Sequence, residues 1–326
     1  MPYGWLLIGL AVLTAVLAVA SLLIGRGGVG VLTAALSPEG EAARIIVLEV
    51  RLPRTLLTLI VGASLGLSGA VLQGLLRNPL AEPALLGASS SAALGAVMVF
   101  YFGVGASFAF ALPLGGMAGT LAATAVLFAL GGRTQDTLTL ILAGVAINSL
   151  TAALTSLALN FAPSPYAALE IVFWILGSFA DRGFDHVAMI VVPTLAGWAL
   201  LATAGRALDA LSLGEDTAAT LGFDVAAIKR RAVLGTAFAI GAAVSVTGVI
   251  SFVGMVVPHL IRPLVGYRPG RLLLPSMIGG AALMTAADIG VRLLSRGMEL
   301  KVGVVTALIG APFFLHLLIS LRRRGP

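Results

Sequence analysis

A few ionisable residues fall inside otherwise apolar stretches, and they are the first candidates for chemistry. Asp288 is the clearest, and Arg292 follows it one helical turn later. An ionisable residue within a membrane span marks a functional site by default. A proton-coupled carrier would use such an acid, but an i,i+4 Asp–Arg pair also forms a structural ion pair. We interpret Asp288 as paired with Arg292 or Arg262 and keep ion-coupled transport through Asp288 as the alternative.

Two serines lie in patterns that hydrolases use. Ser64 stands in a G-x-S-x-G run, and Ser68 stands in Gly66-Leu67-Ser68-Gly69, a pattern used by intramembrane serine proteases of the rhomboid type. His259 could then act as the base. A nucleophile elbow requires a strand–turn–helix context, whereas both serines lie within one apolar helix. An intramembrane protease therefore remains a remote alternative, and we predict no catalytic residue.

Other common chemistries lack their residues. The chain contains no cysteine, which excludes a disulfide framework and a thiolate site. The sequence has no G-x-x-x-x-G-K-[ST] loop for nucleotide phosphates. The three histidines, His186, His259 and His316, are not at metal-ligand spacing. We therefore predict no metal site and no cofactor, and any ATP hydrolysis must occur in another chain.

The elements that carry these residues are apolar helices. Hydrophobic residues make up 59% of the 326 residues, charged residues make up 10%, and the mean hydropathy is +1.07. An ordinary soluble domain carries about 25% charged residues. A span across a bilayer needs about 20 apolar residues as helix. We predict an all-α, polytopic membrane protein, with residues 1–326 as one transmembrane domain and about ten spans at 4–24, 55–76, 84–104, 107–131, 137–160, 187–205, 232–250, roughly 254–267, 272–295 and 303–321.

Basic residues orient these helices. The net charge is +6, and basic clusters occur at 229–231 and 322–324. Basic residues are enriched on the cytoplasmic side of membrane proteins. We therefore place both termini in the cytoplasm and expect contact with membrane lipid but not with nucleic acid.

An internal repeat supports this layout. Residues 62–87 and 241–266 match at a constant offset of 179, with Gly, Ser/Thr and Pro positions in common. In the predicted topology the first copy enters the membrane from outside and the second from inside. Inverted repeats of this kind are common in transporters. We predict an inverted repeat covering residues 55–160 and 232–321.

One polar segment lies on the predicted cytoplasmic side. Residues 206–231 read as two short helices around Gly222, with Glu215 and Asp216 near the start of a turn. The helix dipole favours acidic residues at that position. The segment is either an ordinary connecting loop or an element that contacts a partner.

Several motifs together resemble the FecCD family of ABC importer permeases, which serve iron–siderophore, haem and cobalamin uptake. The resemblance covers nearly the whole chain after the first span. Its marks are RLPR at 51–54, GASLGLSGAVLQGLLRNPLAEPALLG at 62–87, LAGVAINSL at 142–150, WILGSF at 174–179, LSLGEDTAATLG at 211–222, FVGMVVPHLIR at 252–262 and ELKVGVVTALIGAPFF at 299–314.

The resemblance implies an assembly in a bacterial inner membrane. It implies ten helices per subunit, two permease copies as a homodimer, two cytoplasmic ATPase subunits and a periplasmic substrate-binding protein. The transported ligand would be a metal chelate, with iron–siderophore or haem ahead of cobalamin. The chain departs from the family pattern at Met255, at 267–270 and at Lys301, so ligand identity does not follow from the motifs.

The resemblance also implies roles for particular residues. Four arginines would dock the binding protein: Arg51, Arg54, Arg292 and Arg296. Asn78 and Leu80 would form the inner gate. Six residues of the 206–231 segment would couple to the ATPase: Leu213, Gly214, Glu215, Asp216, Leu221 and Gly222. Arg51 and Arg54 are three positions apart, so a helix would place them on neighbouring positions of one face.

Overall fold

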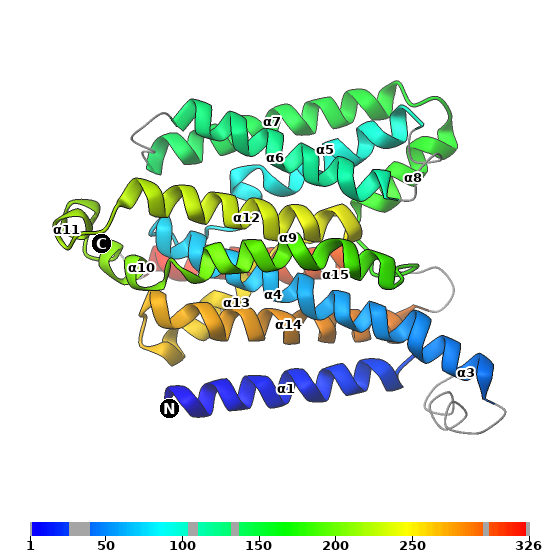
Figure 1. Ribbon diagram of the computed structural model, residues 1–326, viewed down its shortest axis with the longest axis horizontal. Coiled ribbons are helices and arrows are strands. Elements are labelled where there is room, and N and C mark those ends of the chain that lie inside the picture. Colours follow the sequence, from blue (N-terminus) through cyan, green and yellow to red (C-terminus); the bar gives the residue numbers. More distant parts are fainter. Residues whose placement is uncertain (1, 26–39, 104–109, 132–136, 296–299, 324–326) are drawn as a thin grey trace.

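The computed structural model describes residues 2–25, 40–103, 110–131, 137–295 and 300–323, and every regular element in these ranges is helical. The long helices run side by side along one direction (Figure 1). The elements are α1 (Tyr3–Leu23), α3 (Glu41–Ile45), η1 (Ile46–Arg51), α4 (Leu52–Leu75), η2 (Pro83–Leu86), α5 (Ala88–Tyr101), α6 (Ala111–Gly131), α7 (Thr137–Asn160), α8 (Pro165–Ile175), α9 (Phe184–Ala202), α10 (Gly205–Leu211), α11 (Glu215–Thr220), α12 (Val225–Thr247), α13 (Val253–Ile261), η4 (Arg262–Val265), α14 (Pro269–Leu294) and α15 (Val302–Arg323).

The helix lengths fit a multi-pass membrane protein. Six described helical stretches are long and apolar enough to cross a bilayer: Tyr3–Leu23, Glu41–Leu75, Ala111–Gly131, Thr137–Asn160, Phe184–Ala202 and Pro269–Leu294. Shorter apolar helices accompany them, among them α5 and α13. The predicted fold class, an all-α polytopic membrane protein, is therefore confirmed.

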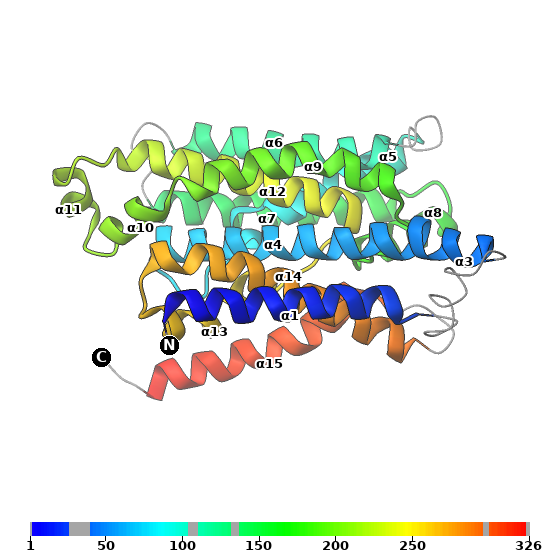
Figure 2. The same cartoon turned by 60° about the horizontal axis from the view of Figure 1, so that its bottom comes forward.

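Helix α4 is the centre of the bundle. Most of its residues are buried, and α14, α9, α12 and α13 surround it (Figure 2). Helix α14 packs closely against it, since a Cβ placed on Gly62 would lie only 2.3 Å from the carbonyl oxygen of Gly280. Small residues allow membrane helices to approach this closely without a hydrophobic driving force.

The second predicted span begins earlier than the sequence indicated. α3, η1 and α4 form one helix from Glu41 to Leu75, so Pro53 lies within a helix and not in its first turn. A proline inside a helix lacks the N–H and clashes with the carbonyl one turn before it. The turn just before Pro53 is a π-helix, Ile46–Arg51, and such wider turns occur as local bulges in helices.

The eighth predicted span is not a full membrane helix. α12 ends at Thr247, residues 248–252 are non-helical, and α13 has only nine residues. At 1.5 Å per residue α13 is roughly 14 Å long, about half the hydrocarbon thickness. Gly248 makes the break with φ 74°, and a Cβ there would lie 2.1 Å from the Trp174 carbonyl oxygen.

The two predicted repeat copies share a local geometry. η2 and η4 are four-residue 3-10 helices exactly 179 positions apart, and both end in a left-handed glycine, Gly87 and Gly266. α4 runs toward the end of the bundle that carries α11, and α12 runs away from it (Figure 1). The second copy differs by its break at Gly248, whereas α4 continues through the equivalent Gly69. The repeat boundaries remain a prediction.

The two ends of the bundle differ. α10 and α11 project at one end, where α1 also begins and α15 ends (Figure 2). α3 and the end of α14 lie at the opposite end (Figure 1). The candidate residues divide between these ends and the region between them.

Candidate functional site

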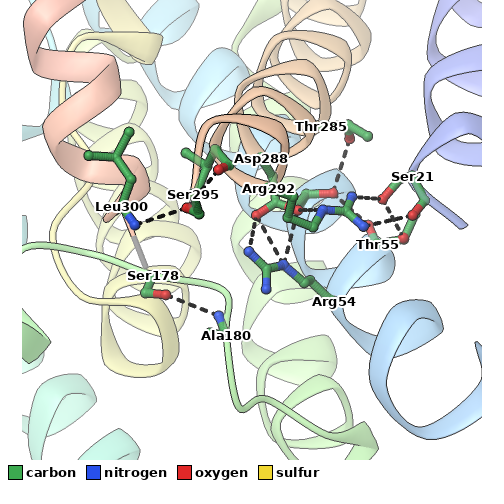
Figure 3. A network of polar contacts seen from close by, with 12 residues as sticks. Ser21, Arg54, Thr55, Ser178, Ala180, Thr285, Asp288, Arg292, Ser295 and Leu300 are labelled. Atoms are coloured by element: carbon green, nitrogen blue, oxygen red, sulfur yellow. Dashed lines mark hydrogen bonds and ion pairs between the residues drawn. The ribbon is translucent and has the colours of Figure 1, made fainter. Parts of the chain in front are cut away.

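Three arginines line one cavity at the α3 end, and two of them contact the Asp288 carboxylate; we call this cluster the arginine pocket (Arg51, Arg54, Arg292 and Asp288). Arg54 donates to Asp288 through Nη2 at 2.8 Å and through Nε at 3.1 Å to both carboxylate oxygens. Arg292 Nε lies 3.1 Å from the other side of the carboxylate, at Oδ2. Asp288 is completely buried, so two guanidinium groups compensate its charge (Figure 3).

Arg51 and Arg292 also hold the end of α1. Arg51 Nη1 donates to the carbonyl oxygens of Leu22 and Leu23 at 2.7 and 3.1 Å. Arg292 Nη1 donates to those of Ser21 and Ile24 at 2.7 and 2.8 Å. The last carbonyls of a helix have no partner within the helix, and cations are favoured beside them. The two arginines therefore cap α1.

This arrangement revises the expectation for docking. Arg51 is only 4% exposed and contacts α1, so it does not present its charge on a shared outer face with Arg54. Arg54 and Arg292 retain 14% and 10% exposure. A cavity of about 470 Å³ opens beside the three arginines, and Asp181 and Ser295 also line it. Arg296 lies outside the described residues.

The prediction that Arg262 is a partner of Asp288 is not supported. Arg262 instead donates from Nη2 to Oε1 of Gln73 on α4, at the other side of the bundle's centre. Gln73 Nε2 in turn donates to the carbonyl oxygens of Gly254 and Met255 at 3.4 and 3.2 Å. Helix α13 ends after nine residues and η4 follows it, so Arg262 packs against α4 at Gln73. Gln73 lies near the end of α4, whereas Arg54 of the arginine pocket lies near its start.

The predicted gate residues form a tight turn after α4. Asn78 accepts a hydrogen bond from the Leu80 amide at 2.9 Å, and its own carbonyl accepts from Ala81 at 3.1 Å. Asn side chains form such turns readily. Both residues are partly buried. Their role in gating remains a prediction.

The same turn touches the break between α12 and α13, which the sequence did not reveal. Glu82 Oε2 accepts from the amide of Phe252 at 3.1 Å. Phe252 has φ 71°, a left-handed conformation that is an outlier for a bulky residue. The acid within the NPLAEP stretch at 78–83 was the available signal. The gate turn and the broken helix are thus one connected region.

The 206–231 segment contains the two short helices α10 and α11. They are separated at Ser212–Gly214, and Gly222 separates α11 from α12, so the predicted division at Gly222 was misplaced by one helix. Leu213 and Leu221 are 67% and 59% exposed at either side of α11. Asp216 is exposed. The segment therefore presents an apolar surface to its surroundings.

Glu215 differs from its neighbours on α11. Its carboxylate accepts hydrogen bonds from Lys229 Nζ at 2.9 Å and from the Thr137 hydroxyl at 2.9 Å. Burial opposes ionisation of Glu215, but these hydrogen bonds and the charges of Lys229 and Arg77 prevail and lower the pKa of its carboxyl group. Sequence reasoning missed Lys229 and Thr137 because they lie 14 and 78 positions from Glu215.

The serines considered as nucleophiles have structural surroundings. Ser64 donates to the Ile60 carbonyl at 2.9 Å and accepts from Trp198 Nε1 at 3.0 Å. Ser68 is completely buried in α4. His259 packs edge-on against Phe313 with ring centroids 5.6 Å apart. Packing thus accounts for Ser64 and for the His259 ring, whereas the buried Ser68 hydroxyl has no hydrogen-bond partner among the described residues.

A multi-pass helical bundle with a charged pocket at one end and projecting helices at the other fits the class of transport permeases. The chain belongs to the FecCD transport family, whose family model matches residues 12–320. It is 38% identical over 295 residues to the vitamin B12 import system permease protein BtuC of Klebsiella pneumoniae subsp. pneumoniae, covering 88% of each chain. It is also 38% identical over 290 residues to BtuC of Escherichia coli O9:H4 (strain HS), covering 88% of this chain and 86% of that one.

A solved structure has the same fold. It is an inward-facing conformation of a metal-chelate type ABC transporter, which matches with a TM-score of 0.86 and 34% identity over 96% of this chain and 98% of that one. Together these similarities support an importer permease and not an ion-coupled carrier or a protease.

Proposed function

We propose that this chain moves a metal chelate across the bacterial inner membrane by alternating access, as one of two permease copies. A periplasmic binding protein delivers the ligand at the arginine pocket, and two cytoplasmic ATPase subunits act on α10 and α11. Both termini are then cytoplasmic. ATP hydrolysis belongs to the partner, and this chain supplies the path.

The position of the two interaction surfaces at opposite ends of the bundle carries this proposal. In the arginine pocket Arg54 and Arg292 contact the Asp288 carboxylate (Figure 3), and the three guanidinium groups outnumber this acid, so the pocket keeps a net positive charge at the α3 end. Leu213 and Leu221 are exposed at the other end. The first surface suits an acidic partner, because complementary charge steers association. The second suits a partner that buries apolar side chains.

Between these surfaces, the gate region links the two halves of the chain. Asn78 and Leu80 lie in the turn that Glu82 ties to Phe252. Opening this turn toward the cytoplasm would therefore involve the break between α12 and α13. Irregular backbone at membrane depth is tolerated where it is buried in protein or lines a cavity.

The exposed face of α7 is a candidate wall of the path between two copies. Asn148 lies about halfway along α7 and is exposed, as are Ser149 and Ser156. A polar group without hydrogen-bond partners in hydrocarbon costs several kcal/mol, roughly 4–8 for transfer to cyclohexane. If a second copy and this face enclose a water-filled path, water can bond the Asn148 amide and that cost does not arise.

The ligand class follows from the relatives. The curated relatives are named for vitamin B12 import and the solved neighbour for a metal chelate. A corrinoid is therefore the first compound to test, ahead of the iron–siderophore and haem that the motifs suggested.

Reconstitution tests the proposal. The chain is placed in liposomes with its ATPase and its binding protein, and uptake of labelled vitamin B12, haem and a ferric siderophore is measured. We expect uptake of one of them to require ATP and both partners. Uptake driven by a proton gradient without the ATPase would instead establish the carrier alternative.

A further inference from the structure

The carboxylate of Glu215 joins the starts of three helices. Glu215 is the first residue of α11, Thr137 is the first residue of α7, and Lys229 lies in the second turn of α12. The Lys229 ammonium is 2.9 Å from each Glu215 oxygen, and the Thr137 hydroxyl is 2.9 Å from Oε1. One side chain thus connects α11 to two helices of the bundle.

Helix α11 has little other attachment. Of its six residues only Ala218 is buried. Gly214 and Gly222 bound it, with φ values of 115° and 88°, a region that glycine adopts readily. A six-residue helix between two such positions is free to tilt as a unit unless side chains fix it. The Glu215 contacts provide that constraint.

Lys229 makes the contact costly to break. Its side chain is only 1% exposed, so its ammonium is shielded from water. Glu215 is 34% exposed, but moving it away would leave the buried ammonium without its counter-charge, which is unfavourable. A displacement of α11 must therefore carry Lys229, and with it the start of α12.

From these contacts we infer that the Glu215–Lys229 ion pair is the joint that transmits movement of α11 into α12, with Thr137 extending the connection to α7. α12 then carries the movement across the bilayer to the break at Gly248, beside the Glu82–Phe252 contact. Glu215 and Lys229 are positioning residues, and the exposed Leu213 and Leu221 make the partner contact. This inference rests on the proposed function, because it assumes that an ATPase moves α11.

Two spin-label positions distinguish movement of α11 itself from movement transmitted to the opposite end of the bundle. The chain has no cysteine, so single cysteines can be placed freely. Thr220 is exposed on α11, and Asp185 is exposed at the start of α9, which packs along α12 (Figure 1). Distances between the labels of two copies are measured in nanodiscs, in the full complex with the ATPase, with and without ATP and vanadate.

When the Glu215–Lys229 pair is intact, we expect ATP to change the distance between the labels of the two copies, both at Thr220→Cys and at Asp185→Cys. With Glu215→Gln, the change at Thr220→Cys should persist. The fraction of complexes that respond at Asp185→Cys should fall about fivefold or more, the lower end of typical coupling between sites. Asp224→Asn neutralises an exposed acid at the start of α12 that lies outside the pair and keeps its capping role, so this variant should respond as the unmodified chain does.

The reversed pair, Glu215→Lys with Lys229→Glu, keeps the attraction and should recover much of the response at Asp185→Cys. An unchanged response at Asp185→Cys in Glu215→Gln would overturn the inference. So would a reversed pair whose response is no larger than that of Glu215→Lys or Lys229→Glu alone. If Glu215→Gln does not assemble, the reversed pair and Lys229→Met decide the question. Absence of any ATP response in the unmodified chain would refute the proposed function instead.

Discussion

Asp288 holds a position where its charge depends entirely on its neighbours. Two arginines approach it, Arg54 from α4 and Arg292 from α14, and water does not reach it. This double pairing explains how an acid is kept within a membrane bundle. The pairing favours a structural role for Asp288, whose carboxylate is shared by the two arginines.

Replacing Asp288 tests that role. Asp288→Asn leaves two buried guanidinium groups without compensation and should destabilise the fold by about 3–5 kcal/mol. We expect a lower folded yield and an earlier thermal transition in detergent. Asp185→Asn, at an exposed acid, serves as the matched control. A normally folded Asp288→Asn variant whose transport loses its pH dependence would favour the proton-carrier role.

Arg51 and Arg54 should behave differently although they are three positions apart. Arg51→Gln removes a cap from α1, so crosslinking between cysteines on α1 and α4 should weaken while docking is retained. Arg54→Gln should weaken docking of the binding protein, and the remaining affinity should fall less steeply with salt, since screening acts over about 8–10 Å. Affinity measured at two salt concentrations compares the variants. Equal effects of both substitutions on docking would contradict this division.

At the scale of elements, α13 depends on α4 for its position. Gln73 binds the first carbonyls of α13, Glu82 binds the amide of Phe252, and Arg262 returns to Gln73. Backbone contact adds to these bonds, because a Cβ on Gly69 would lie 1.8 Å from the Gly254 carbonyl oxygen. A half-length helix is thus held from both of its ends by the other half of the chain.

That contact leads to a prediction about Gly69. Gly69→Ala must separate α4 from α13 and should cost about 1–3 kcal/mol, the usual range for overpacking. We expect a lower thermal transition together with altered basal ATPase activity of the complex, because the gate turn follows α4 directly. Gly9→Ala is the control, since a Cβ there meets nothing within 4 Å. Equal stability of both variants would show that α4 and α13 are not tightly packed.

For the whole molecule, the proposed orientation places α11 and the arginine pocket on opposite sides of the membrane. Both lie at ends of the bundle, with α1 beginning and α15 ending on the α11 side (Figure 2). This arrangement agrees with an even number of crossings. Which end of the bundle faces the cytoplasm is then a matter for measurement.

Labelling from one side of the membrane measures this orientation. In intact cells, an impermeant maleimide should modify Asp185→Cys but not Thr220→Cys, and opening the membrane should make both reactive. Both residues are exposed in the single chain, so protection in cells that express it without its partners reports the side of the membrane and not burial. Labelling of Thr220→Cys in intact cells would reverse the proposed orientation.

Local composition determined much of this protein. Apolar runs of sufficient length have to be membrane helices, because about 20 apolar residues span the hydrocarbon. Clustered motifs such as RNPLAEPALLG indicated the family before any contact was known. The short helices in 206–231 and the i,i+4 partner of Asp288 could also be predicted from the sequence, since both depend on neighbouring residues. Each of these features is decided within one or two helical turns.

Only the tertiary structure decided which charges meet. Arg54 reaches Asp288 across 234 positions and Glu82 reaches Phe252 across 170, distances over which sequence spacing carries no information. The interruption between the predicted spans 232–250 and 254–267 was found from the sequence, but its start at Gly248 was not, because the apolar residues there suit a helix and the close approach of Trp174 favours the non-helical path. Local patterns set the helices, whereas burial in the assembled bundle requires each charge to find its partner, and that requirement chose the pairs.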